Sequence, residues 1–203
     1  EIENTFEVNS KILVALWGIE TSFGEYTGKL DILRSLASLA YDGRRKDFFS
    51  KELENALLIL EKKHFNREQF KGSWAGAFGQ TQFMPSTFLN YAIDFDGDSK
   101  INLFKKSDAL ASGANYLKNA GWNNSLQWGE SVNLEINDFF LSLAKSKKFK
   151  SVNFWKRNGI KLNKNYENNK LKLIILIQII MIVILSQKTL MLYWIGIDQA
   201  ILR

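Results

Sequence analysis

Glu20 is the residue whose type and surroundings best suit acid–base chemistry. It lies at the end of a segment in which apolar residues recur at helical spacing, and Trp17 and Phe23 flank it. Apolar neighbours exclude water from a carboxyl group and raise its pKa, which is the condition for a general acid near neutral pH. From the spacing alone, the alternative is a solvated glutamate at a helix end.

An acidic turn over residues 94–108 is the second candidate site. The oxygen donors at positions one, three, five and seven of an EF-hand loop would come from Asp94, Asp96, Asp98 and the backbone carbonyl of Lys100. Ser99 stands where such a loop prefers glycine, and Lys105 stands where it has its closing glutamate, so Asp108 would have to close the site from a longer loop. The turn therefore holds either calcium, or a similar hard cation, or no ion at all.

A glycine-punctuated stretch, residues 71–88 (KGSWAGAFGQTQFMPSTF), is the third. Its glycines have neither the spacing of a P-loop nor that of a dinucleotide-binding motif, which disfavours phosphate binding. Polar and aromatic side chains alternate along it and would suit the hydroxyls and faces of an extended polysaccharide: Ser73, Gln80 and Gln82 beside Trp74, Phe78 and Phe83. The alternative is a loop whose glycines serve tight packing.

The composition excludes several classes of site. The chain of 203 residues has no cysteine and one histidine, which excludes a disulfide scaffold and a Cys-ligated metal and leaves little material for a Ser-His-Asp triad. The formal net charge is +6, but part of the excess comes from the last 33 residues. Basic and aromatic residues do not interleave and no nucleic-acid motif appears, so we expect no nucleic-acid partner.

Helices are expected to position these candidates. They are predicted to begin at Asn9 or Ser10, Asp31, Lys46 and Pro85. Another is predicted to be capped by Ser107 and to run to about Ala120, and a short one to span 136–145. No long alternating strand pattern appears, so the fold class is predicted to be mainly α.

Six blocks in this order resemble the soluble core of the lytic murein transglycosylase B family: ALWGIETSFG, LASLAYDGRR, KELENALLILEKK, KGSWAGAFGQTQFMPSTF, YAIDFDGDSKINL and ANYLKNAGW. The likeness covers roughly Asn9 to Trp122. It implies a lysozyme-like, mainly α fold with an EF-hand-like loop, and cleavage of the glycan strands of peptidoglycan, which would be the chain's partner.

The resemblance also implies roles for single residues. Glu20 matches the family's single acid/base, which cleaves the bond between N-acetylmuramic acid and N-acetylglucosamine and leaves a 1,6-anhydromuramoyl end without any cofactor. Ser73 and Gln82 match glycan-contacting positions and Tyr116 an aromatic lining position. Arg44 and Arg45 match residues near the peptide stem. The family's structural calcium site maps onto Asp94, Asp96, Asp98, Lys100 and Asp108.

Residues 1–170 are predicted to form the transglycosylase core, and residues 171–203 an atypical tail in which 23 of 33 residues are hydrophobic. The tail lacks the family's closing pattern, WNRSSYFA. The sequence gives little support for a transmembrane span, because the apolar run is short and Gln178 interrupts it. A buried helix or strand is possible on composition. The favoured hypothesis is a shift of the reading frame near residues 171–176. If Met181 to Arg203 are back-translated with AT-rich codons and the nucleotides are regrouped by two, the new frame can encode DSYFVTKNFDVILDWNRSSYFA, which contains the missing pattern.

Two rival functions stay open beside the transglycosylase. A catalytically impaired peptidoglycan-binding remnant would keep the groove contacts without turnover, and a lysozyme-like hydrolase would leave reducing ends. The chain begins with Glu1 rather than methionine, so the core is expected to be incomplete at its N-terminus. Family members are exported, which implies the periplasm or the periplasmic face of the outer membrane, with membrane contact only through an N-terminal anchor not present in this chain.

Overall fold

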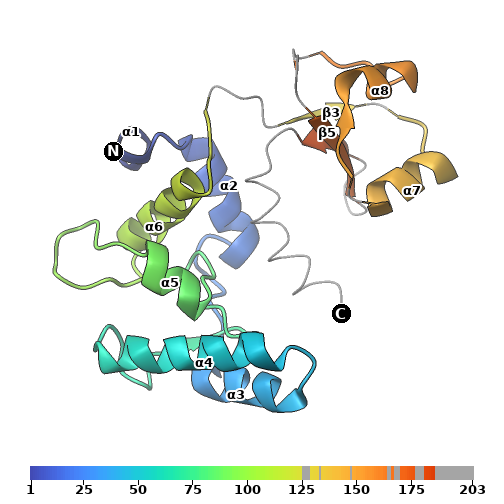
Figure 1. Cartoon of the computed structure of the whole chain (residues 1–203). Helices are drawn as coiled ribbons and strands as arrows, with labels where there is room; N and C mark the ends of the chain where they lie inside the picture. Colours follow the sequence, from blue (N-terminus) through green and yellow to red (C-terminus); the bar gives the residue numbers. More distant parts are fainter. Residues whose placement is uncertain are drawn as a thin grey trace. The chain divides into compact units, whose positions relative to one another are not determined.

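The computed structural model describes residues 1–124, 129–132, 134–146, 148–163, 166, 170–176 and 181–185. The chain divides into two units, residues 1–122 and 123–203. Each unit has a hydrophobic core of its own. Figure 1 labels the helices of both units and the strands β3 and β5.

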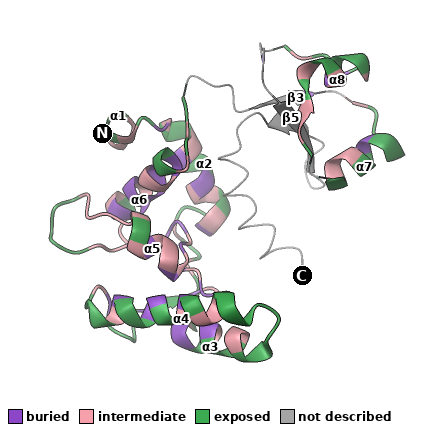
Figure 2. Cartoon of the chain, viewed as in Figure 1, coloured by how far each residue is buried: buried purple, intermediate pink, exposed green. Residues whose placement is uncertain are grey.

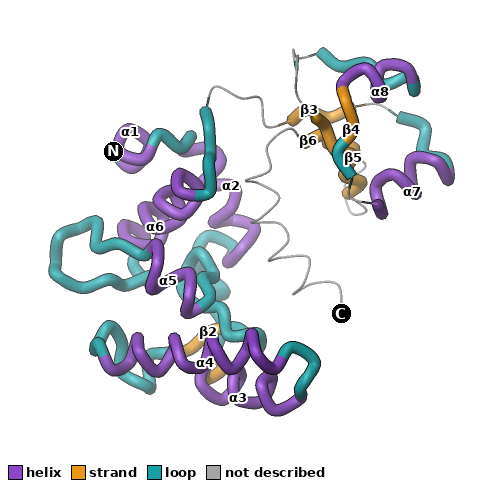
Figure 3. Tube along the Cα trace, in the orientation of Figure 1, coloured by secondary structure: helices purple, strands orange, loops and turns teal. Residues whose placement is uncertain are grey.

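The first unit is helical apart from one short strand pair (Figure 3). Its helices are α1 (Ile2–Phe6), α2 (Ser10–Thr21), α3 (Ile32–Asp42), α4 (Lys46–Glu61), α5 (Pro85–Tyr91) and α6 (Lys106–Asn119). Strands β1 (Leu30–Asp31) and β2 (Lys71–Gly72) pair in antiparallel fashion, with Leu30 opposite Gly72. The prediction of a mainly α fold is confirmed for this unit.

Local sequence signals set the starts of three of these helices. The Asn9 side chain accepts a hydrogen bond from the backbone N–H of Lys11 (2.9 Å), and Asp31 accepts one from Arg34 (2.9 Å). These bonds satisfy backbone donors that a helix start leaves open. Pro85 occupies the first turn of α5, as predicted, because it has no N–H to leave unpaired.

The predicted cap of α6 is wrong. The helix begins at Lys106, so Ser107 lies within its first turn, and no side chain caps it at Lys105. The Ser107 hydroxyl instead donates to Asp96 at 3.2 Å, eleven residues earlier. A contact within the acidic turn therefore uses the side chain that the sequence had assigned to the helix start.

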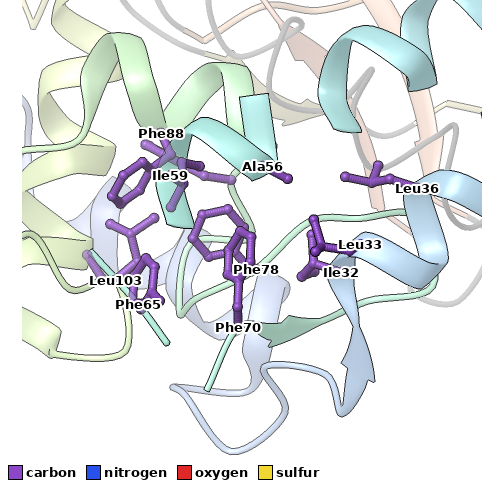
Figure 4. Packing of buried hydrophobic residues seen from close by; sticks show 12 residues of the cluster. Ile32, Leu33, Leu36, Ala56, Ile59, Phe65, Phe70, Phe78, Phe88 and Leu103 are labelled. Carbon is purple, nitrogen blue, oxygen red and sulfur yellow. The ribbon is translucent and has the colours of Figure 1, made fainter. Parts of the chain in front are cut away.

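Phenylalanines dominate the core of the first unit (Figure 4). Helices α3 and α4 pack against each other and enclose Leu36 and Ile59, which are fully buried, while exposed residues cover their outer faces (Figure 2). The Phe70 and Phe78 rings meet edge to face at 4.8 Å, and Phe65 stacks on Phe70 at 5.5 Å. Edge-to-face and stacked contacts add to the hydrophobic gain of burying rings.

The described residues of the second unit form two helices and a sheet that the sequence did not predict. Its helices are α7 (Asp138–Ser146) and α8 (Val152–Arg157), and its strands are β3 (Gly129–Val132), β4 (Lys150–Ser151), β5 (Lys170–Leu176) and β6 (Met181–Leu185). The strand order is β3-β6-β5-β4, and every pairing is antiparallel. Trp155 is fully buried in this unit's core.

The apolar tail is described only in part. Residues 171–176 and 181–185 form most of β5 and all of β6, with Lys172 opposite Leu185 and Leu176 opposite Met181. The remainder of 171–203 lies outside the described residues. Across the part of the chain that the structure describes, every helix is too short or too polar to cross a bilayer.

Candidate functional site

Glu20 lies in the last turn of α2, where the helix stops abruptly. Ser22 and Phe23 both adopt left-handed backbone conformations (φ 49° and 61°), so the helix ends one residue after the glutamate. The Phe23 ring turns back onto Trp17, edge to face at 5.5 Å. Glu20 is half-buried, and this burial raises its pKa to about 7. A carboxyl group in that state can give and take a proton at neutral pH.

A buried amide ties this turn to the rest of the unit. The Trp17 indole N–H donates to Oε1 of Gln80 at 2.8 Å, and the Gln80 side-chain NH₂ donates to the carbonyl of Phe104. The Thr21 hydroxyl donates to the carbonyl of Gln80 at 2.9 Å, and the Gln80 N–H donates to that of Leu103 at 2.8 Å. Three segments distant in sequence thus meet beside Glu20.

The glycine-rich stretch faces the core more than the sequence suggested. Phe78 and Phe83, expected to face sugars, are 0% and 3% exposed, and Gln80 is 7% exposed. Trp74 is the one exposed residue among the three aromatics that were expected to face sugars. At Gly79 (φ 75°), a Cβ would lie 2.4 Å from Leu103, so that glycine permits close packing of the protein on itself.

Ser73 and Gln82 lie on either side of this packed segment. Ser73 is partly exposed, and its hydroxyl accepts a hydrogen bond from the N–H of Ala77 at 3.1 Å. Gln82 has a left-handed backbone (φ 49°), and its side-chain NH₂ donates to the carbonyls of Thr27 (3.1 Å) and Gly79 (2.8 Å). Gln82 is thereby held against the segment that follows the turn of Glu20.

Tyr116, on α6, is half-buried in an aromatic cluster. Its ring meets Tyr91 edge to face at 5.2 Å and lies 5.9 Å from the ring of Phe83. Burial, with a smaller contribution from Tyr91, raises the pKa of the Tyr116 hydroxyl above its ordinary value. The phenol therefore stays protonated and able to donate at neutral pH.

Arg44 and Arg45 lie in the exposed connection between α3 and α4. Arg44 pairs with Asp42 at 3.5 Å, and the Arg45 guanidinium lies 4.2 Å above the centre of the Phe48 ring. An exposed pair of this kind contributes little to stability but leaves the guanidinium groups accessible to an anion.

The acidic turn brings three of its four aspartates together. Carboxylate oxygens of Asp94, Asp96 and Asp108 lie within 4.8 Å of one another. Asp108 is fully buried, and it accepts hydrogen bonds from the N–H groups of Phe95 (3.1 Å) and Asn102 (2.9 Å), which lie earlier in the turn. Such a set of hard oxygen donors suits calcium.

Lys105 forms ion pairs within this turn that the sequence did not predict. Its ammonium group bridges Asp96, at 3.1 Å, and Asp98. The hydrogen bond from Lys105 holds the pKa of Asp96 below its ordinary value, and the bonds to Asp98 and Asp96 raise the pKa of Lys105. A positive charge thus already occupies the side of the turn where Asp98 was expected to bind a metal. The lysine at the twelfth loop position was the available signal.

The sequence matches a known protein family and one of its characterised members. A family model for the transglycosylase SLT domain matches residues 1–188. The membrane-bound lytic murein transglycosylase B of Escherichia coli (strain K12) is 45% identical over 118 residues, which is 58% of this chain and 33% of that protein. The chain therefore spans a third of the length of this relative.

Solved structures of related proteins match the fold over nearly the whole chain. SltB3 from Pseudomonas aeruginosa, in complex with NAG-NAM-pentapeptide, matches with a TM-score of 0.79 and 34% identity over 95% of this chain and 54% of its own. The Escherichia coli lytic transglycosylase Slt35, in complex with calcium, matches with a TM-score of 0.78 and 30% identity over 95% of this chain and 62% of its own. The predicted fold, lysozyme-like and mainly α with an EF-hand-like loop, is confirmed, and the chain belongs to the transglycosylase SLT domain family.

Proposed function

We propose that the chain is a peptidoglycan lytic transglycosylase and that Glu20 is its single acid/base. The observation that carries this proposal is a half-buried carboxyl group whose pKa burial raises to about 7, at the end of α2. A group with this pKa is protonated often enough to act as an acid at neutral pH and is still a usable base after it has lost its proton.

One carboxyl group suffices because the substrate supplies its own nucleophile. Glu20 donates its proton to the glycosidic oxygen as the bond to C1 of N-acetylmuramic acid breaks, and N-acetylglucosamine leaves as an alcohol. The Glu20 carboxylate then accepts the proton of the muramoyl 6-hydroxyl, whose oxygen bonds to C1. The product is a 1,6-anhydromuramoyl end, and Glu20 is protonated again without water having been consumed. Lysozyme-type hydrolases commonly need a second carboxylate for water or for a covalent intermediate.

The residues that contact the substrate are assigned by their exposure and by the polar atoms of their side chains. Ser73 and Gln82 contact the glycan, and Tyr116 lines the groove with a hydroxyl that can donate to sugar oxygens. Arg44 and Arg45 bind carboxylates of the peptide stem. The exposed charge of the arginines and the complex of SltB3 with NAG-NAM-pentapeptide support this assignment.

Calcium is proposed as a structural ion of the acidic turn, without a part in the chemistry. The calcium ion would be bound by carboxylate oxygens that already lie close together, those of Asp94, Asp96 and Asp108. Asp98 and the backbone carbonyl of Lys100 would complete the coordination. The calcium complex of Slt35 supports the assignment. The bridging ammonium of Lys105 would have to leave Asp96 and Asp98 when the ion binds.

The substrate places the chain in the bacterial envelope. We assign it to the periplasm or the periplasmic face of the outer membrane, in keeping with the membrane-bound relative. Cell fractionation of the native host, with an antibody against the chain, tests this assignment. Recovery of the protein in the cytoplasmic fraction would contradict it.

Digestion of purified murein sacculi tests the activity. We expect the wild-type chain to release muropeptides with 1,6-anhydro ends, at a rate that falls as the pH rises through 7, and Glu20→Gln to release none. Glu25→Gln, which changes an exposed carboxylate five residues away, serves as the matched control. Reducing ends would favour a lysozyme-like hydrolase instead, and binding without release would favour a catalytically impaired peptidoglycan-binding remnant.

Residues 171–203 are proposed to derive from a shifted reading frame following a core of residues 1–170. The apolar composition of the tail and the absence of WNRSSYFA support this proposal. The nucleotide sequence of the gene decides it, since the codons for Met181 to Arg203, regrouped by two nucleotides, should encode DSYFVTKNFDVILDWNRSSYFA. Codons that cannot do so would rule the shift out.

A further inference from the structure

Gln80 has a polar side chain that the proposed chemistry does not use. It is 7% exposed, so its amide cannot serve as a groove contact. A buried amide is costly unless its donors and acceptor are satisfied. Its Oε1 accepts from the Trp17 indole, and its NH₂ donates to the carbonyl of Phe104, so both ends of the amide are engaged.

The two partners fix which end of the amide faces which segment. An indole N–H can only donate, and a carbonyl can only accept. A side chain at this position therefore needs an acceptor toward Trp17 and a donor toward Phe104, and glutamine carries both. Methionine would match its size and flexibility but would leave the indole N–H and the Phe104 carbonyl without this partner.

Trp17 lies one helical turn before Glu20, so the amide acts on the same turn that carries the acid. A second hydrogen bond reinforces the link, because the backbone carbonyl of Gln80 accepts from the side-chain hydroxyl of Thr21, the residue after Glu20. The chain leaving α2 passes over the amide so closely that a Cβ at Gly24 (φ 92°) would lie 2.5 Å from Oε1 of Gln80. Hydrogen bonds to Gln80 therefore hold the end of α2 on both sides of Glu20, at Trp17 and at Thr21.

We propose that Gln80 is a positioning residue for Glu20, holding the last turn of α2 at its depth through Trp17 and the carbonyl of Phe104. This role rests on the proposed function of Glu20 as the acid/base. Without the amide, the turn would loosen, water would reach the carboxyl group, and the proton donor would lose its fixed place relative to the glycosidic oxygen. The ammonium group of Lys106 also contacts the Trp17 indole and lies 5.4 Å from the centre of its ring. The variants described below leave Lys106 unchanged.

Gln80→Met in the full chain tests the role, with Gln69→Met, an exposed glutamine, as the matched control. We expect Gln80→Met to lower kcat on sacculi about tenfold with KM within about twofold, because a misplaced acid affects the transition state more than binding. Carbon-detected NMR titration of the Glu20 carboxyl should show its pKa falling from about 7 toward the ordinary value of 4.5. Gln69→Met should change neither quantity.

Trp17→Phe removes the other end of the same hydrogen bond and provides a second test. It should reproduce the loss of kcat, and Trp17→Phe with Gln80→Met together should lose little more than either alone. Independent, additive losses would overturn the proposal, as would a raised KM with unchanged kcat or an unchanged titration of Glu20 in Gln80→Met. If the wild-type chain released no anhydro ends, the proposed function would fail, while the NMR titration would still decide the positioning role.

Discussion

Glu52, buried on α4, accepts two hydrogen bonds from Ser86 in the first turn of α5, one from its N–H at 2.9 Å and one from its hydroxyl at 2.6 Å. The carboxylate joins two helices and satisfies a backbone donor that the start of α5 leaves open. Only 3% of Glu52 is exposed, so its carboxylate is shielded from water.

Removal of this carboxylate should destabilise the first unit. Glu52→Ala removes the acceptor of both Ser86 donors, which are partly buried, and we expect it to lower the free energy of unfolding by about 3 kcal/mol. Glu52→Gln keeps an acceptor for the N–H and can donate to the hydroxyl, so it should cost about 1 kcal/mol. Urea denaturation measures both. Glu54→Ala, at an exposed residue paired with Lys51, is the control, and an equal loss there would contradict the prediction.

The raised pKa of Glu20 implies that the acid costs stability at neutral and alkaline pH. The folded chain keeps the proton up to about pH 7, whereas the unfolded chain releases it near 4.5, so stability falls as the pH rises between these values. Glu20→Gln should therefore be more stable than wild type at pH 8, by about 2 kcal/mol after allowance for partial exposure. The difference should vanish below pH 4.5. Thermal unfolding at several pH values tests this, and a constant difference would refute it.

Ser99 has a left-handed backbone (φ 67°) in the acidic turn, a conformation that costs a residue with a Cβ about 1 kcal/mol. Ser99→Gly should raise the free energy of unfolding by about 0.5 kcal/mol, because it removes this cost and keeps the Ser99 N–H bonded to Asp94. Gly97→Ala is the reverse control. A Cβ at Gly97 meets nothing within 4 Å, so its φ of 73° alone should make that variant less stable. Equal effects of the two changes would show that backbone conformation is not the cause.

Lys105 should weaken calcium binding by competing for Asp96 and Asp98. Lys105→Gln removes the competing charge, and we expect it to bind calcium about tenfold more tightly by isothermal titration calorimetry. Lys106→Gln gives the same change in net charge one residue away and should have a much smaller effect. Equal affinities for the two variants would mean that the bridge does not oppose the ion.

Signals confined to a few neighbouring residues could be predicted from the sequence. Asn9, Asp31 and Pro85 start their helices as expected, because a cap bonds only to the turn it begins. The raised pKa of Glu20 could also be anticipated from Trp17 and Phe23, each of which lies three residues from Glu20 in the sequence.

Features that depend on distant partners could not be predicted. Ser107 looked like a cap but bonds to Asp96, and Phe78 looked like a sugar platform but packs on Phe65 and Phe70. The sheet of the second unit was missed because β3 and β4 are short and pair with β6 and β5, which lie far along the chain. In each case the outcome is set by side chains or strands that only the tertiary fold brings together.

The glycine-rich stretch carries two kinds of residue with separate duties. Phe78 and Phe83 maintain the core, whereas Ser73 and Trp74 remain at the surface. Substitutions at the surface positions can therefore accumulate without loss of the folded state. A soluble product with a cooperative melting transition is consequently a poor guide to retained catalysis in this family, and screens of diverged members should score product chemistry rather than folding yield.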